Sequence, residues 1–144
     1  MRAAVSGDGT GAIGEALPRA GWPRTLELAR RHGLVGILAH GLGAAGWDGV
    51  APPVRAAVED EARELAARNL ALAAELLRVL DALAARGIPA IPYKGPALAV
   101  AAYGRLALRP FLDLDVIVPR DAVAAAGALL EAEGFRPVSP LPAG

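Results

Sequence analysis

One segment constrains the fold of this chain more than any other: a helical pattern that runs without interruption from Pro52 to about Arg86. Two prolines open it, as a first helical turn tolerates, and Gly87 predicts where it ends. Leucines recur at three- and four-residue steps and form one apolar stripe, at Leu65, Leu72, Leu76, Leu80 and Leu83. The stripe predicts a long helix packed on a core. A coiled-coil partner helix is the alternative, although Glu61 and Asn69 interrupt its heptads.

The other face of this helix is charged. Opposite charges stand at helical-neighbour spacings in Glu59–Arg63, Glu64–Arg68 and Glu75–Arg78. Each such pair stabilises a helix by a few tenths of a kcal/mol, about 0.2–0.5. The spacing therefore predicts three ion pairs along the helix.

Composition excludes several classes of function. The chain of 144 residues has no cysteine, which excludes a disulfide scaffold, a thiolate metal site and a cysteine nucleophile. Its 15 basic residues balance its 15 acidic residues, which argues against binding to long nucleic acid. Charges recur too often for a membrane span, and no secretory signal is visible. We therefore expect a soluble, cytoplasmic protein with no membrane partner.

The remaining chain divides around the long helix. Residues 1–21 are rich in glycine and alanine and predict a flexible leader. Residues 22–87 predict an N-terminal helical region, with a first helix over 23–42 that is broken or kinked near Gly33 and Gly36. Residues 88–144 predict a small sheet with flanking helices.

Two short segments of this last region predict strands. Residues 88–93 are apolar but interrupted by proline, which predicts an edge strand, and a helix follows over 97–103. Residues 111–118 alternate, with Leu112, Leu114 and Val116 on one face and two aspartates on the other, before Ile117 and Val118, which we expect to be buried. A helix should follow from Asp121 to about Glu133, stopped by Gly134. Residues 135–138 could start another strand.

The two aspartates, Asp113 and Asp115, are the strongest candidates for chemistry. Residues two apart on a strand point the same way, and two carboxylates on an apolar strand need solvent, a counter-charge or a cation. Mg²⁺ prefers oxygen ligands of this kind and keeps substrate phosphates as further ligands. An exposed, merely solvated strand face is the alternative.

Basic groups near this strand favour a phosphate ligand. Lys94-Gly95 occupies a strand-to-helix turn, where free backbone N–H groups attract phosphate, and Lys94 is the single lysine of the chain. Arg109, four residues before Asp113, could clamp a phosphate oxygen or form a salt bridge with one of the aspartates.

These residues resemble a known family. Tyr93-Lys-Gly-Pro-Ala-Leu98, then Tyr103, then Leu108-Arg-Pro-Phe-Leu-Asp-Leu-Asp-Val-Ile-Val118 and Glu133-Gly-Phe135 look like the uncharacterised nucleotidyltransferase family of the DNA polymerase β superfamily. The likeness extends over roughly residues 22–135. It implies a nucleotidyltransferase fold in which Asp113 and Asp115 hold Mg²⁺ or Mn²⁺ and the nucleotidyl group of a nucleoside triphosphate passes to an acceptor that the sequence does not identify. By analogy, Lys94 and Gly95 would bind the triphosphate, and Arg109 would bind a phosphate or the acidic pair.

The resemblance also defines two departures. The wider superfamily has Gly-Ser or Gly-Gly where this chain has Lys94-Gly95, and it places a third carboxylate on a later strand, whereas no acidic residue follows Glu133 here. We therefore expect an α/β (α+β) domain that corresponds to the first part of a longer enzyme. Its unpaired sheet edge should favour self-association. A catalytically inactive nucleotide-binding remnant and a helical interaction module are the alternative functions.

Overall fold

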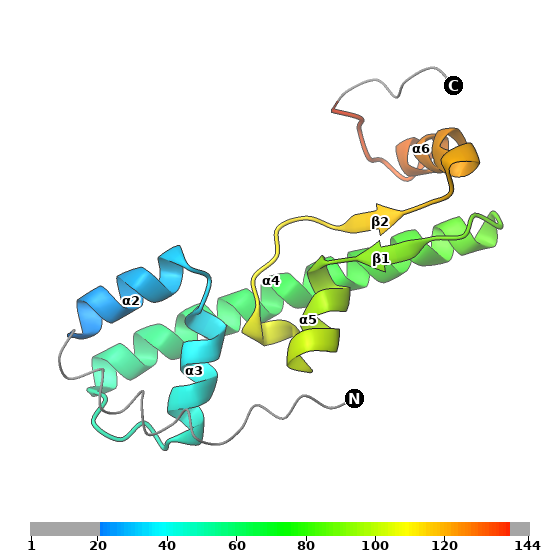
Figure 1. Cartoon of the computed structure of the whole chain (residues 1–144). Helices are drawn as coiled ribbons and strands as arrows, with labels where there is room; N and C mark the ends of the chain where they lie inside the picture. The colour runs from blue at the N-terminus through cyan, green and yellow to red at the C-terminus, as the bar shows by residue number, and fades with distance from the viewer. Residues whose placement is uncertain (1–20, 139–144) are drawn as a thin grey trace.

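The computed structural model describes residues 21–138 and has a mixed α+β fold (Figure 1). The predicted leader, residues 1–21, lies outside this range except for its last residue. The elements in chain order are α2 (Trp22–Arg31), α3 (Val35–Ala44), α4 (Pro52–Ala85), β1 (Ile91–Tyr93), α5 (Gly95–Tyr103), the 3₁₀ turn η1 (Leu106–Leu108), β2 (Asp115–Ile117), the 3₁₀ turn η2 (Arg120–Ala122) and α6 (Val123–Ala132). Between residues 21 and 138, no helix has both the length and the apolar character that crossing a membrane requires.

Helix α4 confirms the predicted helix to within one residue. It begins with the two prolines and ends in a Schellman motif. In this motif the Gly87 N–H donates to Ala84 O at 2.9 Å and the Ile88 N–H donates to Leu83 O at 3.0 Å. The motif needs a left-handed residue at position 87, and Gly87 supplies it with a φ of 68°. Gly134 ends α6 in the same way, as predicted.

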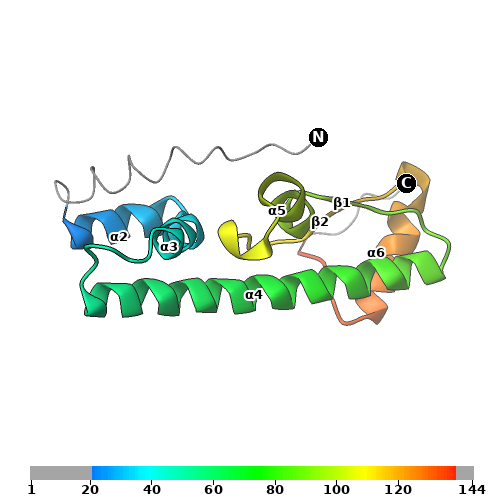
Figure 2. The same ribbon diagram turned by 90° about the horizontal axis from the view of Figure 1, so that it is seen from below.

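One face of α4 is buried along the whole helix. Its buried residues are Val58, Leu65, Asn69, Leu76, Val79 and Leu83, while Leu72 and Leu80 are half-buried. Different elements cover this face in turn: α3 near the start, then η1 and α5, then α6 (Figure 2). The leucine stripe is therefore core, as predicted, and it does not offer a surface to a partner helix.

The ion pairs of α4 differ from the predicted ones in two of three cases. Glu75 and Arg78 pair at 2.8 Å, as expected. Glu59 pairs instead with Arg55 at 2.8 Å, and Arg63 pairs with Asp60. The spacing alone could not choose a partner for Arg63, because Asp60 and Glu59 stand three and four positions before it.

Arg78 also ties the end of α6 to α4. Its guanidinium pairs with Glu133 and lies 5.7 Å from the centroid of the Phe135 ring. The expected strand at residues 135–138 is wrong for this reason: the Phe135 N–H closes the α6 cap by donating to Leu130 O at 2.9 Å, and the described residues that follow are irregular.

The predicted helix over residues 23–42 is two helices. Helix α2 ends at Arg31 and α3 starts at Val35, so the break falls at Gly33, as expected. Gly36 lies inside α3 and allows very close packing on η1. A Cβ atom built on Gly36 would lie 2.1 Å from Ala107 O. Only glycine fits at this crossing.

The sheet has two strands within the described residues. Strands β1 and β2 pair antiparallel, with Ile91 opposite Ile117, Pro92 opposite Val116, and Tyr93 opposite Asp115. Leu114, Val116 and Val118 line an apolar groove of about 350 Å³ against α4 and α6, which shows that they share the inner face. Next to them lies the core cluster of Val79, Leu83, Ala126 and Leu129.

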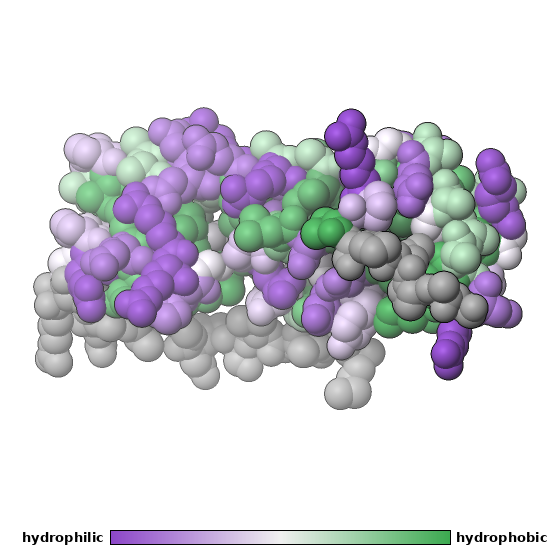
Figure 3. All heavy atoms as spheres, turned by 90° about the horizontal axis from the view of Figure 1, so that it is seen from above, coloured by the Kyte–Doolittle hydropathy of each residue, from purple (hydrophilic) through white to green (hydrophobic). Residues whose placement is uncertain are grey.

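The expected burial of Ile117 is wrong, because its side chain is 51% exposed, and Val118 is only half-buried. Leu112, which was expected on the same strand face as Leu114 and Val116, is 81% exposed. The ladder pairs only residues 115–117 of the predicted strand 111–118, so Leu112 lies outside the paired strand. Ile117 alternates with Val116 and Val118 along the strand, so it points to the opposite face of the sheet. Figure 3 shows that hydrophobic surface is exposed between hydrophilic side chains on one face of the molecule.

Candidate active site

The antiparallel register brings the Lys94-Gly95 turn next to the acidic pair. Because Tyr93 is opposite Asp115, the residues just after β1 run beside the residues just before β2. A Cβ atom built on Gly95 would lie 3.3 Å from the backbone oxygen of Asp113. Gly95 and Asp113 are 18 residues apart in sequence, and they thus meet at one end of the two-stranded ladder (Figure 1).

Lys94 has an unusual backbone conformation. Its φ is 60° and its ψ is −148°, a region that residues other than glycine rarely adopt. Such a conformation costs on the order of 1–3 kcal/mol. The side chain is exposed, and its Nζ lies 5.2 Å from the centroid of the Tyr93 ring. A lysine is thus held at a turn where glycine would be unstrained.

The start of α5 leaves backbone donors at this turn. Lys94 is the N-cap residue, no side chain caps the helix, and Pro96 stands in its first turn. The first intrahelical bond is that of the Leu98 N–H to Lys94 O, at 3.1 Å. The helix therefore presents its positive end beside Gly95.

The two aspartates carry no counter-charge from the described residues. Asp113 is exposed, and Asp115 is half-buried at the start of β2. Within residues 21–138, all ion pairs involve other carboxylates. The alternative of a salt bridge between Arg109 and an aspartate is thus not observed. In the same range, no three acidic or histidine residues cluster closely enough to form a metal site by themselves.

Arg109 is anchored through its backbone by a residue that the sequence had not indicated as functional. Asn69 of α4 is fully buried, and its Nδ2 donates to Leu106 O at 2.6 Å and to Arg109 O at 2.9 Å. Asn69 therefore holds the segment that leads into the acidic strand. In the sequence, Asn69 is a polar residue that interrupts the heptads of the long helix, and this interruption was the available signal of its role. The coiled-coil interpretation did not indicate which groups Asn69 would bind.

Two buried polar atoms lie in this region without a hydrogen-bond partner among the described residues. They are the Oδ1 of Asn69 and the Nη1 of Arg109. An unpaired buried donor favours binding of an acceptor. Arg109 has no ion pair within residues 21–138, so an anion bound by its guanidinium would not have to displace a carboxylate.

We expect Asn69→Ala to lower the free energy of unfolding by about 2 kcal/mol, because two backbone carbonyls lose their donor and a cavity forms. Urea denaturation followed by circular dichroism measures this change. Arg68→Ala is the matched control on the same helix, since its side chain is exposed, and it should change stability by less than about 0.5 kcal/mol. Equal effects of the two substitutions would contradict a holding role for Asn69.

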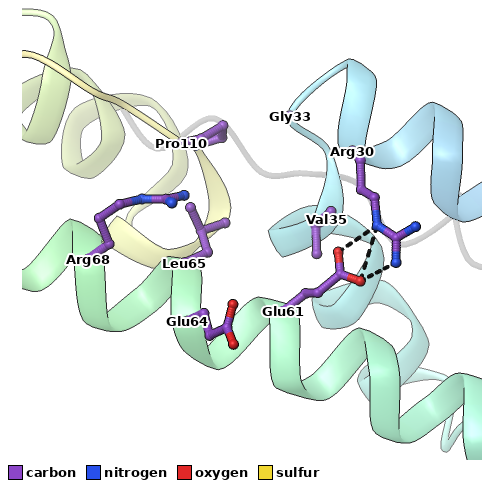
Figure 4. Close-up of a pocket in the computed structure, with 8 residues that line it drawn as sticks. All are labelled: Arg30, Gly33, Val35, Glu61, Glu64, Leu65, Arg68 and Pro110. Atoms are coloured by element: carbon purple, nitrogen blue, oxygen red, sulfur yellow. Dashed lines mark hydrogen bonds and ion pairs between the residues drawn. The ribbon is translucent and has the colours of Figure 1, made fainter.

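A separate groove of about 270 Å³ lies where α2, α3 and α4 meet the segment after η1. Arg30 and Glu61 face each other on one side of it, and Arg68, Leu65 and Pro110 lie on the other (Figure 4). The Arg30 Nε donates to Glu61 Oε2 at 2.9 Å, and this bond holds the pKa of Glu61 below its ordinary value. The pair therefore stabilises the fold at neutral pH, and its contribution is lost as the pH falls through the lowered pKa.

Comparison with protein families assigns the chain to the nucleotidyltransferase class. The family described as uncharacterised nucleotidyltransferase matches residues 18–143, and the chain belongs to this family. The resemblance predicted from the sequence is confirmed. Neither the curated proteins nor the solved structures gave a match.

Proposed function

We propose that this chain binds a nucleoside triphosphate with a divalent metal ion, for transfer of the nucleotidyl group to an acceptor. One observation supports the proposal: Gly95 lies against the backbone of Asp113, which brings the Lys94-Gly95 turn next to the segment that carries the acidic pair. A phosphate at the turn would lie next to carboxylates that bind cations. Family membership supports the same reaction class.

The acidic pair fits Mg²⁺ or Mn²⁺. Both side chains supply hard oxygen ligands, and within residues 21–138 neither is engaged in an ion pair. Two carboxylates leave coordination positions for substrate phosphates, as Mg²⁺ sites commonly do. When bound, the metal would neutralise phosphate charge and make the α-phosphorus easier to attack.

In this proposal, Lys94, Gly95 and Arg109 each contact a different part of the triphosphate. Lys94 supplies a point charge, and Gly95 allows a phosphate to approach the backbone at the positive end of α5. Arg109 supplies planar donors for a further phosphate oxygen. The positive charges of Lys94 and Arg109 offset part of the negative charge of the triphosphate, which would otherwise oppose binding beside two aspartates.

A nucleotide-binding protein without catalysis is the second candidate. In the reaction, an acceptor oxygen attacks the α-phosphorus, pyrophosphate leaves, and the acceptor proton needs a base. The acidic residues of α6 and its cap, Glu131 and Glu133, are remote in sequence from the acidic pair, and Glu133 is paired with Arg78. The lack of a third clustered carboxylate within residues 21–138 favours this candidate.

Binding and turnover measurements test the proposal separately. Calorimetric titration with ATP, CTP, GTP or UTP in Mg²⁺ should show binding that disappears when the metal is removed. Labelled nucleotides with Mn²⁺ then report transfer. Binding with transfer supports the enzyme, and binding without transfer supports the non-catalytic candidate. If no nucleotide binds with either metal, both candidates fail.

Two substitutions of Lys94 separate the effect of its charge on binding from the effect of its backbone strain on stability. Lys94→Gly should raise the free energy of unfolding by about 1 kcal/mol, because glycine relieves the positive φ at some cost in backbone entropy. It should also weaken triphosphate binding about tenfold, because a charged contact is lost. Thermal unfolding and calorimetric titration measure the two effects.

Lys94→Ala is the matched control. It removes the same charge but keeps a Cβ atom at the strained turn, so it should weaken binding equally without increasing stability. If both variants bind nucleotide as tightly as the parent protein, Lys94 has no role in binding.

A further inference from the structure

The outer face of α4 carries a second regular stripe, opposite the buried one. Its residues are Arg63, Ala67, Leu70, Ala74, Leu77 and Asp81, all of them exposed. They recur at alternating steps of four and three residues. At about 100° per residue they fall within about 80° of one another around the helix. We call this set the outer stripe.

The outer stripe exposes large hydrophobic side chains. Leu70 is 64% exposed and Leu77 is 61% exposed. Elements α2, α3, α5 and the sheet lie on the other side of α4, as Figure 2 shows. An exposed apolar strip bounded by charges is typical of an interaction surface.

The sequence of the outer stripe is complementary to itself when it is read in reverse. Consider two α4 helices that pair antiparallel about a two-fold axis at the level of residue 72. Position i of one copy then faces position 144 − i of the second copy. Ala67 then faces Leu77, and Leu70 faces Ala74, so each large side chain meets a small one. Such alternation allows two helices to pack closely.

The charges follow the same symmetry. Arg63 faces Asp81 of the second copy at both ends of the stripe, about 27 Å apart at 1.5 Å per residue. Asp81 has no ion pair within residues 21–138, and Arg63 has only the exposed Asp60 three residues before it. A parallel pair would instead place like charges together and leucine against leucine. Charge complementarity therefore selects the antiparallel orientation.

We infer that the outer stripe is the interface of an antiparallel dimer of this chain. The interface is isologous, because every contact occurs twice about the two-fold axis. One helix from each copy provides less area than the roughly 1,600 Å² of a standard interface, so we expect reversible association in the micromolar range.

Sedimentation equilibrium over a range of protein concentrations tests this inference. The parent chain should associate to a dimer, and Leu70→Glu should weaken association at least about tenfold, because a buried carboxylate would face Ala74 of the second copy. Val100→Glu is the control, since Val100 is similarly exposed on α5, and it should leave association unchanged. A parent chain that stays monomeric at high micromolar concentration would overturn the inference.

Charge exchange tests the pairing itself. Arg63→Asp and Asp81→Arg should each weaken the dimer, because each places like charges at both ends of the stripe. The double variant Arg63→Asp/Asp81→Arg should restore it. Single variants without effect, or a double variant that is weaker than either, would contradict the antiparallel register. Circular dichroism confirms that each variant folds.

Disulfide cross-linking between introduced cysteines reports how the two α4 helices are oriented. Because the chain has no cysteine, no native disulfide contributes to the signal. A mixture of Ala67→Cys and Leu77→Cys chains should form mixed disulfide dimers faster than either variant alone. Faster cross-linking of Ala67→Cys with itself would indicate a parallel pair and contradict the proposal. Association through the open sheet edge, which the sequence also suggested, would be insensitive to every substitution in the outer stripe.

Discussion

Gly36→Ala should destabilise the fold by at least about 3 kcal/mol, since overpacking against backbone cannot relax by rotating a side chain. The added Cβ would lie 2.1 Å from Ala107 O and 3.1 Å from the Cα of Leu108. Relief requires α3 to move away from η1, and η1 is fixed on α4 by Asn69. The substitution thus disturbs the contact through which the N-terminal helices support the segment that leads to the acidic strand.

The same substitution seven residues further along α3 provides the control. A Cβ built on Gly43 would meet only the Nε1 of Trp47, at 3.9 Å. Gly43→Ala should therefore raise the free energy of unfolding by about 0.5–1 kcal/mol, as glycine-to-alanine changes in helices commonly do. Urea titrations of the two variants should shift in opposite directions. If the two curves shift alike, α3 does not pack on η1 as described.

The double variant Asp113→Asn/Asp115→Asn should lose metal-dependent nucleotide binding, with an affinity at least about 100-fold lower, because both anionic ligands of the metal are removed. The parent protein should melt at a higher temperature in Mg²⁺ or Mn²⁺, since a ligand that binds the native state stabilises it. This metal-dependent increase should be absent in the double variant. Without metal, the variant should be at least as stable as the parent, because the repulsion between two carboxylates is relieved.

Asp121→Asn is the control for the acidic pair. Asp121 is exposed in η2, after the acidic strand and outside the site. The substitution removes one negative charge from the same part of the fold. The metal-dependent increase in melting temperature should therefore be the same in this variant as in the parent protein. A double variant that still binds nucleotide in a metal-dependent manner would show that other groups hold the metal.

The sequence by itself determined the elements whose signals are local. Helix α4 and its end at Gly87 followed from helical periodicity and from the left-handed residue that a Schellman motif needs. The proline-interrupted strand before Lys94 and the acidic strand were likewise expected, because a period of two and missing N–H donors depend on the segment alone. The family was readable from residues 93–118 for the same reason: these motifs are contiguous.

Tertiary structure decided what depends on residues far apart in the chain. The burial of Ile117 was wrongly expected, because alternation does not say which face of a sheet a helix will cover. The role of Asn69 depends on carbonyls about 40 residues later, which no periodicity reveals. The meeting of Gly95 with Asp113 depends on strand register, and register is fixed only when two strands pair over a core. Local patterns thus defined the segments, and long-range packing defined the site.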